Sequence, residues 1–367
     1  MSNPNLLLLI AVVAGAGLSA ILTSTVRSIA RRRQLVDLPG AHKSHDKPVA
    51  LGGGVAILLS VVIPMVFAMI MARAWQDHAP TWIPPGARIH FGGIVAKTPL
   101  ALAIIFAAMF ACGLGLWDDL RPLGPLVKLL VEIGIALFLV IPFRLRLLSH
   151  FGDAVSITLS VLWIVTLMNS LNFLDNMDGL AAGVALIATA VFALAAQRDG
   201  QVFVPMCCAL FVGALAGFLP LNFYPASIYM GDAGSLTIGL LLAVFTILTT
   251  FADPARGQQP IGVLAPLVVM AVPLYDTASV IFLRWRQGSP IWTGDRRHFS
   301  HRLLRRGMNV PQAVCVIWLA TLVTALPALW LATATWPEAC GIALQTFLVI
   351  ALVAVLESSG SSGKPAR

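Results

Sequence analysis

The sequence contains eleven long apolar runs, and these runs limit the possible folds more than any other feature of the chain. A helix needs about 20 mostly apolar residues to cross the hydrocarbon core of a bilayer. Backbone polar groups find no water there, so each run is expected to be helical. The pattern predicts an all-α polytopic membrane protein with about 11 transmembrane helices. The runs are 6–26, 51–72, 98–116, 126–142, 156–171, 180–196, 204–219, 233–251, 261–283, 312–331 and 340–356.

The composition agrees with a membrane protein. Charged residues make up only 11% of the 367 residues, and hydrophobic residues make up 58%. Soluble domains carry about 25% charged residues, so this composition excludes an ordinary soluble domain. We expect one integral-membrane domain over residues 1–356. The Ser/Gly-rich stretch 357–367 is expected to be a disordered cytoplasmic tail.

The distribution of Lys and Arg predicts the orientation of the helices. If the segment after the first run is cytoplasmic and the sides alternate, more than two thirds of the 24 Lys and Arg residues fall inside. Basic loops favour the cytoplasmic side, which predicts an N-terminus outside and a cytoplasmic C-terminus. The same bias explains the net charge of +8, so we expect no nucleic-acid partner. All the polar motifs then lie on the cytoplasmic face.

The stretch 169–183, NSLNFLDNMDGLAAG, places two carboxylates between apolar runs. An ionised Asp in mid-bilayer costs roughly 2.5–3.5 kcal/mol, so Asp175 and Asp178 need a reason to be there. Asn172, Asp175 and Asp178 are spaced by three and would share one face of a helical turn. Asn can both donate and accept, which suits a uracil edge or sugar hydroxyls. The alternative is a polar contact between helices.

Two further motifs bring carboxylates to the ends of apolar runs. Asp118 and Asp119 are adjacent and would repel each other without a cation between them; a Mg²⁺ site, or a base beside one, would explain the pair. The alternative is a water-facing pair or an ion pair with Arg121. Asp232 lies just before the eighth run, three residues after Tyr229, which could stack on a base. The alternative there is an ordinary helix cap.

Two basic segments complete the set. The stretch 42–54, HKSHDKPVALGGG, joins Lys43 and His45 to three glycines whose backbone N–H groups could bind an anion. The stretch 295–307, DRRHFSHRLLRRG, carries His298, His301 and Arg302, and Arg suits phosphate. A basic loop without a ligand and a helix touching anionic lipid are the respective alternatives. The motifs together indicate a site for a metal-chelated nucleotide sugar.

Taken together and in this order, the motifs resemble the polyprenyl-phosphate N-acetylhexosamine-1-phosphate transferase family (glycosyltransferase family 4). KSHDKPVALGGG resembles its K-x-H-x-x-P-x-x-x-G-G motif, and WDDL its Asp-Asp motif. NSLNFLDNMDGLAAG resembles N-x-x-N-x-x-D-x-x-D-G-L, and NFYPASIYMGDAGS resembles N-x-x-P-A-x-x-x-M-G-D-x-G-S. The last family motif usually reads His-Ile-His-His, whereas Ser300 replaces one imidazole here.

The resemblance implies a reaction and a set of roles. A HexNAc-1-phosphate, expected to be GlcNAc-1-phosphate, would pass from a UDP-sugar to undecaprenyl or another polyprenyl phosphate, releasing UMP. This would be the first membrane step of a cell-envelope polysaccharide, at the cytoplasmic face of the inner membrane. The cofactor would be Mg²⁺, with Mn²⁺ as a substitute, and a homodimer stays open. The implied catalytic residues are Asp118, Asp119, Asp175, Asp178, His298 and His301. The implied substrate contacts are Lys43, His45, Asn172, Asn222, Tyr229 and Arg302, and the implied metal ligands are Asp232 and Asp118.

Three alternatives stay open at this point. The first is the same chemistry on UDP-MurNAc-pentapeptide, although the triple histidine and the Thr-Met-Gly-Gly loop of that branch are absent. The second is a lipid or sugar transporter, whose acids should line a path near mid-bilayer. The third is a membrane scaffold without catalysis, which gives no reason for clustered acids.

Overall fold

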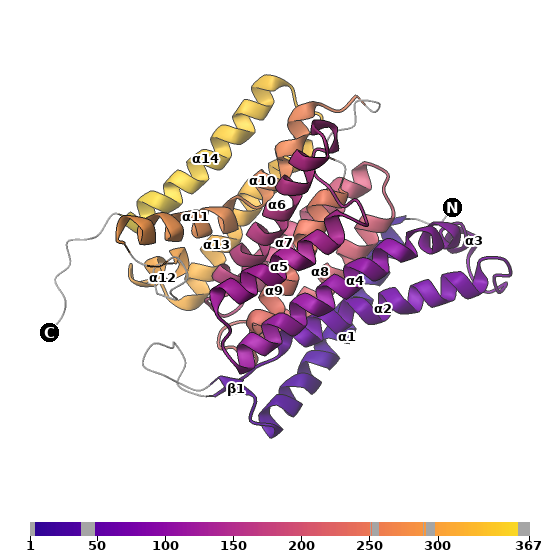
Figure 1. The fold of residues 1–367 in the computed structure, drawn as a ribbon, viewed down its shortest axis with the longest axis horizontal. Coiled ribbons are helices and arrows are strands. Elements are labelled where there is room, and N and C mark those ends of the chain that lie inside the picture. The colour runs from indigo at the N-terminus through magenta and orange to yellow at the C-terminus, as the bar shows by residue number, and fades with distance from the viewer. Residues whose placement is uncertain are drawn as a thin grey trace.

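The structure is a computed structural model that describes residues 4–37, 48–249, 251, 257–288, 290 and 298–358. These residues form a helical bundle with one very small sheet (Figure 1). The elements are α1 (Pro4–Arg32), β1 (Val36–Asp37), β2 (Val49–Ala50), α2 (Gly53–Trp75), α3 (Pro85–Arg88), α4 (Phe91–Leu120), α5 (Pro125–Val140), η1 (Ser149–Phe151), α6 (Asp153–Leu174), α7 (Leu180–Arg198), α8 (Phe203–Asn222), α9 (Gly231–Leu248), η3 (Pro260–Leu264), α10 (Ala265–Val269), α11 (Ala271–Arg286), α12 (Phe299–Leu304), α13 (Val310–Ala325), η4 (Leu326–Trp330) and α14 (Trp336–Ser358).

The helices agree with the predicted all-α membrane fold. Within the described ranges, nine helices are long and apolar enough to cross a membrane, or ten if one bent pair is a single span. Each of the eleven predicted runs falls on helical structure, but α5 has only 16 residues. At 1.5 Å per residue it reaches about 24 Å, short of the roughly 30 Å hydrocarbon core. The number of spans and their orientation therefore stay predictions.

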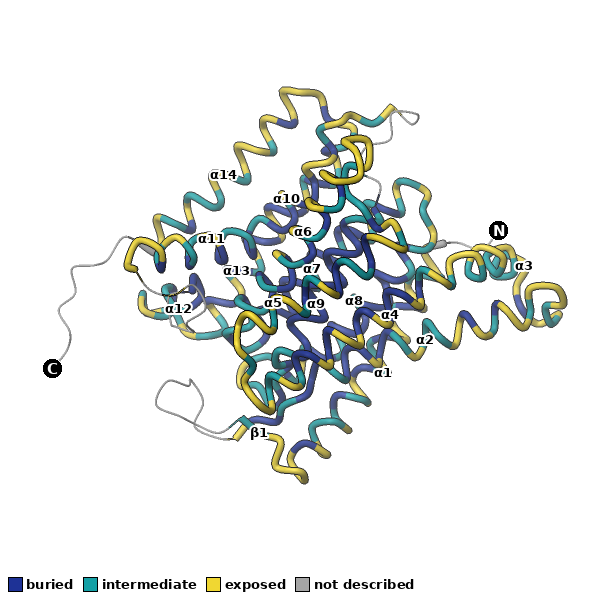
Figure 2. The backbone as a smooth tube through the Cα atoms, in the orientation of Figure 1, coloured by how far each residue is buried: buried dark blue, intermediate teal, exposed yellow. Residues whose placement is uncertain are grey.

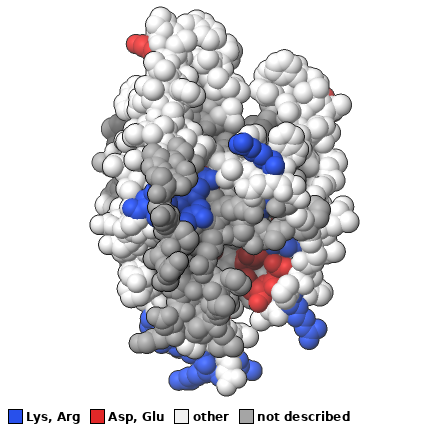
Figure 3. All heavy atoms as spheres, turned by 90° about the vertical axis from the view of Figure 1, so that its left-hand side faces the viewer, with Lys and Arg blue, Asp and Glu red and all other residues white. Residues whose placement is uncertain are grey.

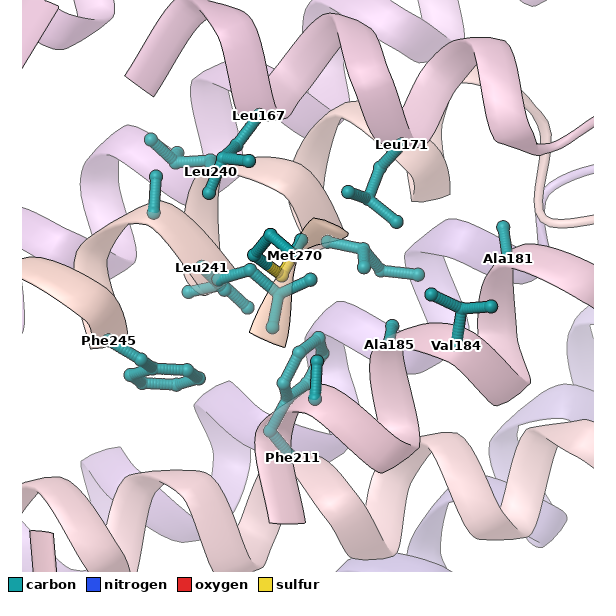
Figure 4. Close-up of a cluster of buried hydrophobic side chains, with 14 of the residues drawn as sticks. Leu167, Leu171, Ala181, Val184, Ala185, Phe211, Leu240, Leu241, Phe245 and Met270 are labelled. Carbon is teal, nitrogen blue, oxygen red and sulfur yellow. The ribbon is translucent and has the colours of Figure 1, made fainter. Parts of the chain in front are cut away.

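The bent pair is the ninth predicted run. Residues Pro260–Val269 and Ala271–Arg286 meet at 66°. Met270 lies at the bend and is fully buried. Figure 4 shows its side chain among apolar residues of four other helices, including Leu171, Val184, Phe211 and Leu241. The bend thus lies at a buried residue, and beyond it α11 packs against α6.

Burial differs strongly from one helix to another. In the most apolar 18-residue window of α9, 78% of the residues are buried within the bundle, whereas in that of α14 only 11% are. Figure 2 shows α9 among the darkest helices at the centre, and Figure 1 places α14 at one edge, opposite α1 and α2. A helix that is apolar all round is either central or in contact with lipid. The exposed apolar side chains of α14 thus fit a lipid-facing helix.

The short sheet and the glycines after it correct one prediction. β1 pairs antiparallel with β2, and Ala50 also bridges to Ile228. The N–H groups of Gly53 and Gly54 donate to the carbonyls of Tyr229 and Met230, at 2.9 and 3.1 Å. Those donors are therefore already used and cannot cradle an anion. A Cβ on Gly54 would lie 2.2 Å from the backbone of Gly234, so this glycine permits close packing of α2 on α9.

The C-terminal prediction is only partly covered. Helix α14 continues to Ser358, two residues beyond the expected end of the membrane domain at 356. Residues 359–367 lie outside the described residues, as do Lys43 and His45 of the first basic segment.

Candidate active site

The candidate site lies where the ends of several helices meet. Asp118 occupies the last turn of α4, Asp232 the first turn of α9, and Asn172 the last turn of α6. Figure 3 views this end of the bundle and shows Asp and Glu atoms gathered chiefly in one patch, with Lys and Arg atoms on the same face. Residues more than a hundred positions apart in the sequence thus share one end of the bundle.

A lysine joins the two carboxylates expected to bind metal. Lys128 Nζ lies 3.0 Å from Asp118 Oδ2 and 2.5 Å from Asp232 Oδ2. Asp118 Oδ1 also accepts from the backbone N–H of Leu123 at 2.6 Å. Asn172 Nδ2 donates to Asp232 Oδ1 at 2.9 Å. The two carboxylates therefore converge on one positive charge, and the amide of Asn172 orients the second of them.

Asp119 makes a different contact from its neighbour. Its Oδ1 accepts from the N–H of Asp232 at 2.8 Å, and its Oδ2 accepts from the N–H of Ala233 at 3.2 Å. These N–H groups belong to the first turn of α9, where helices lack internal acceptors. Asp119, a residue of α4, therefore caps the N-terminus of α9, and Asp232 does not cap its own helix. Both oxygens of Asp119 are used, which favours a positioning role over the direct role that the resemblance implied.

Two glycines allow this cap to form. A Cβ on Gly115 would lie 2.2 Å from backbone atoms of Asp232, and a Cβ on Gly231 would lie 2.4 Å from Asp119 Oδ2. Gly231 also has φ +66°, a conformation that favours glycine. The small residues before each carboxylate are thus what bring α4 and α9 into contact.

The turn between α6 and α7 corrects a second prediction. Helix α6 ends at Leu174, so Asn172, Asp175 and Asp178 do not share one helical face. Asn172 contacts Asp232, whereas Asp178 Oδ2 accepts from the N–H of Ala226 at 2.9 Å. Asn172 and Asp178 therefore contact different segments of the chain. The spacing of three was a valid helical pattern, but helical geometry stops before it is complete.

Asp175 differs from Asp178 in its hydrogen bonds. Among the described residues, we find no hydrogen bond to its carboxylate. Desolvation, followed by the charges of Asp232, Asp119 and Asp178, raises the pKa of Asp175 well above its ordinary value. Desolvation and nearby acids, Asp178 among them, also raise the pKa of Tyr229. Burial and the neighbouring acids thus disfavour the ionised form of Asp175, and a bound cation would favour it.

Asn222 lies behind the site. It is buried, its Oδ1 accepts from the N–H of Gly179 at 3.2 Å, and its Nδ2 donates to the carbonyl of Ile228 at 3.0 Å. Its amide therefore ties the α6–α7 turn to the segment before α9. The expected substrate contact at Asn222 is replaced by this bracing contact.

Helix α12 approaches the same turn from the other side. His298 immediately precedes α12, and His301 and Arg302 lie within it. Ser300, which stands where the family has a histidine, donates to Asn176 Oδ1. Arg302 Nη2 donates to Ser279 Oγ of α11 at 2.8 Å. The part of the last basic motif that the structure describes, from His298 onward, is therefore docked against the turn that carries Asp175 and Asp178.

Sequence reasoning missed Lys128 as a site residue. It was one of many cytoplasmic basic residues, and the signal that could have found it is its place on α5, one turn before the buried Glu132. Glu132 and Asp276 lie within the fourth and ninth apolar runs, where an acid predicts a polar contact inside the bundle. Both make such a contact. Glu132 accepts from Asn169, and Asp276 contacts His298.

The carboxylates can be tested for a fit to Mg²⁺. In the part of the chain that the structure describes, no three His, Cys, Asp or Glu side chains are grouped to hold a metal ion. Mg²⁺, however, is usually bound through one or two carboxylates together with substrate phosphates and waters. Asp118 and Asp232 both contact the ammonium of Lys128, so their oxygens already converge on a cation. The donor set therefore fits this kind of site.

Comparisons with known proteins place the chain among related transferases. Residues 101–250 match the model of glycosyl transferase family 4. The chain is 33% identical to the decaprenyl-phosphate N-acetylglucosaminephosphotransferase of Mycobacterium tuberculosis (strain ATCC 25618 / H37Rv), over 81% of this chain and 76% of that protein. It is 29% identical to the probable undecaprenyl-phosphate N-acetylglucosaminyl 1-phosphate transferase of Bacillus subtilis (strain 168), over 92% and 87%. It is 25% identical to the undecaprenyl-phosphate alpha-N-acetylglucosaminyl 1-phosphate transferase of Escherichia coli (strain K12), over 80% and 76%. With these relatives and the matching motifs, the chain belongs to glycosyl transferase family 4.

Proposed function

We propose that this protein transfers GlcNAc-1-phosphate from UDP-GlcNAc to a polyprenyl phosphate, with UMP as the second product. The family and the names of the relatives support the transfer to a polyprenyl phosphate. The observation that carries the proposal is the convergence of Asp118 and Asp232 on Lys128, at one end of an apolar bundle. With a divalent cation held by these carboxylates, such a site would suit two phosphate groups that must be brought together.

The reaction explains why charged residues are needed. An oxygen of the polyprenyl phosphate attacks the phosphorus that carries the sugar, and the bond to the bridging oxygen breaks, so that its electron pair leaves with UMP. Both reactants are anions, and their repulsion must be reduced before they can meet. Bound Mg²⁺ would supply positive charge to the diphosphate, with Asp232 and Asp118 holding it. Lys128 supplies a fixed positive charge beside both carboxylates.

The remaining residues divide into orienting and binding groups. Asp118 orients the lipid phosphate or takes its proton at Oδ2, the oxygen that contacts Lys128. Asp119 and Asn172 keep Asp232 in place. Asp175, Asp178 and Tyr229 lie on the turn side and bind the uridine and the sugar, and His298, His301 and Arg302 bind the diphosphate or the sugar from the α12 side.

The positions of the acids favour this reaction over transport. A transporter is expected to bind its substrate near the middle of its spans. Asp118 and Asp232 lie instead in the end turns of α4 and α9. With the N-terminus outside, this end of the bundle faces the cytoplasm, where sugar nucleotides are present. The reaction would then be the first membrane step in the synthesis of a cell-envelope polysaccharide.

A single assay tests the proposal. Purified protein is incubated with UDP-[¹⁴C]GlcNAc and undecaprenyl phosphate, with Mg²⁺, with Mn²⁺ or with EDTA, and both labelled lipid and UMP are measured. We expect equal amounts of labelled lipid and UMP, and neither in EDTA. UDP-GalNAc and UDP-MurNAc-pentapeptide in parallel define the donor. Label crossing a vesicle membrane without UMP would refute the proposal in favour of a transporter.

A further inference from the structure

A buried contact joins α11 to the start of α12. Asp276 Oδ2 lies 2.9 Å from His298 Nδ1, and Asp276 Oδ1 accepts from the N–H of Phe299 at 2.7 Å. The side chains are 1% and 7% exposed for Asp276 and His298. Both oxygens of this carboxylate are therefore spent on two consecutive residues, and neither is left to contact substrate.

The contact decides which nitrogen of the imidazole carries the proton. An ionised carboxylate can only accept, so Nδ1 of His298 must donate. In the neutral ring this fixes the Nδ1–H tautomer and leaves Nε2 with a lone pair. The second bond, to the N–H of Phe299, fixes the backbone from which the ring extends. Tautomer and ring orientation are thus set by one side chain of another helix.

The orientation matters because of what lies next to the ring. His298 packs edge-on to Phe173 with centroids 6.0 Å apart, and Phe173 is in the last turn of α6. Ser300 of α12 donates to Asn176, so a second contact holds α12 against the same turn. Asp175 and Asp178 belong to that turn. These contacts therefore restrain the ring of His298 at a position beside the acidic turn.

We propose that Asp276 is a positioning residue for the transfer reaction, which holds His298 as the Nδ1–H tautomer so that Nε2 is the ring atom left for the sugar nucleotide. This inference rests on the proposed function for its kinetic part. A carboxylate buried in an apolar bundle is costly unless it is paired. His298 is the side chain that pairs with Asp276. Asp276 acts through His298 and not on the substrate.

The first test reads the tautomer directly. The full chain, labelled with ¹⁵N-histidine, is placed in nanodiscs, and His298 is assigned from the signal that is lost in His298→Gln. We expect a single Nδ1–H form in the wild type and a mixed population in Asp276→Asn, which keeps the size but loses the charge. Asp276→Glu keeps the charge and should restore part of the Nδ1–H signal. A wild-type ring protonated at Nε2 alone would overturn the inference.

The second test is a double-mutant cycle on turnover. We expect Asp276→Asn to lower kcat about 10- to 100-fold, because small misplacements of a reacting group cost up to this much. The same change in a His298→Gln background should have almost no further effect, since coupled residues are not additive. Additive losses would show that Asp276 acts on the fold alone. If Asp276→Asn does not fold, Asp276→Glu takes its place in the cycle. Because it keeps the charge, we expect its kcat to lie closer to that of the wild type.

Thr277→Val is the matched control. Thr277 is the next residue of α11, is buried, and its hydroxyl has no hydrogen-bond partner among the described residues. This change should leave both the tautomer and turnover unchanged; a loss as large as that of Asp276→Asn would point to disturbance of α11. If the wild type makes no labelled lipid at all, the proposed function fails, whereas the tautomer still tests the contact.

Discussion

Two parts of the candidate site are stabilised in opposite ways. At the junction of α4 and α9, Asp118, Asp232 and Lys128 form a cluster in which carboxylates outnumber the lysine. Desolvation, and then the charges of Asp232 and other nearby acids, raise the pKa of Asp175 beside it. At the junction of α11 and α12, Asp276 has a partner for each oxygen and is buried. The first arrangement has more carboxylates than cationic side chains, whereas in the second every oxygen of the carboxylate has a partner within the protein. The comparison separates residues that we propose to bind ligands from residues that position other side chains.

The largest expected effect comes from neutralising the carboxylates of the first junction. Asp118→Asn and Asp232→Asn should each abolish UMP release, with losses of roughly a hundredfold or more. An acid–base group such as Asp118 contributes about that much, and so does the charge stabilisation by a metal that Asp232 would hold. The measurement is initial UMP release, with folding checked by size-exclusion chromatography in detergent. Near-normal turnover in either variant would contradict the assigned roles. Asp153→Asn, an exposed acid paired with Arg146, is the control.

Removing the lysine should separate charge balance from catalysis. In Lys128→Met the two carboxylates lose the positive charge that they share, so turnover should fall about tenfold or more, since this side chain bridges groups placed at the reacting phosphates. Divalent cation should then raise the melting temperature by more than in the wild type, because the competing ammonium is gone. Thermal melts with Mg²⁺ and with EDTA measure this. Lys97→Met, at the other end of α4, should change neither quantity, and an unchanged cation effect in Lys128→Met would argue against the shared cation site.

A methyl group should test how closely the helices must approach. Gly115→Ala forces α4 away from the backbone of Asp232, and overpacking of this kind costs about 1–3 kcal/mol. We expect a lower melting temperature and lower turnover together, because the Asp119 cap is lost as well. Gly113→Ala is a matched control on the same helix, since nothing lies within 4 Å of its added Cβ. Equal behaviour of the two variants would show that the close approach is not required.

The smallest expected effect is on stability without substrate. Because the pKa of Asp175 is raised in the folded protein, its ionised form destabilises the fold, and this cost appears as pH rises above the unfolded pKa. Asp175→Asn should therefore raise the melting temperature at pH 8 in EDTA by roughly 1–3 °C, although turnover is lost. The difference should shrink as pH is lowered toward 4. A variant less stable than the wild type at pH 8 would contradict the repulsion at this turn.

The sequence predicted more of the fold than of the site. The apolar runs all lie on helical structure, because a chain in a bilayer has to satisfy its backbone groups within each segment. The buried acids Glu132 and Asp276 were recognisable because charge in an apolar run needs a partner. The helical face assumed for Asn172, Asp175 and Asp178 was wrong, since α6 ends at Leu174. Helix ends depend on tertiary contacts, and spacing alone does not reveal them.

What the sequence by itself determined is which residue types are present at the ends of which apolar runs, and that a membrane transferase of this family fits them. Only the tertiary structure decided what each one does. Asp118 and Asp119 are neighbours in the chain, yet one meets Lys128 and the other caps α9. The reason is physical: a helix turns about 100° between consecutive residues, so adjacent side chains point to different neighbours, and only the packing of α4 on α9 and α5 says which.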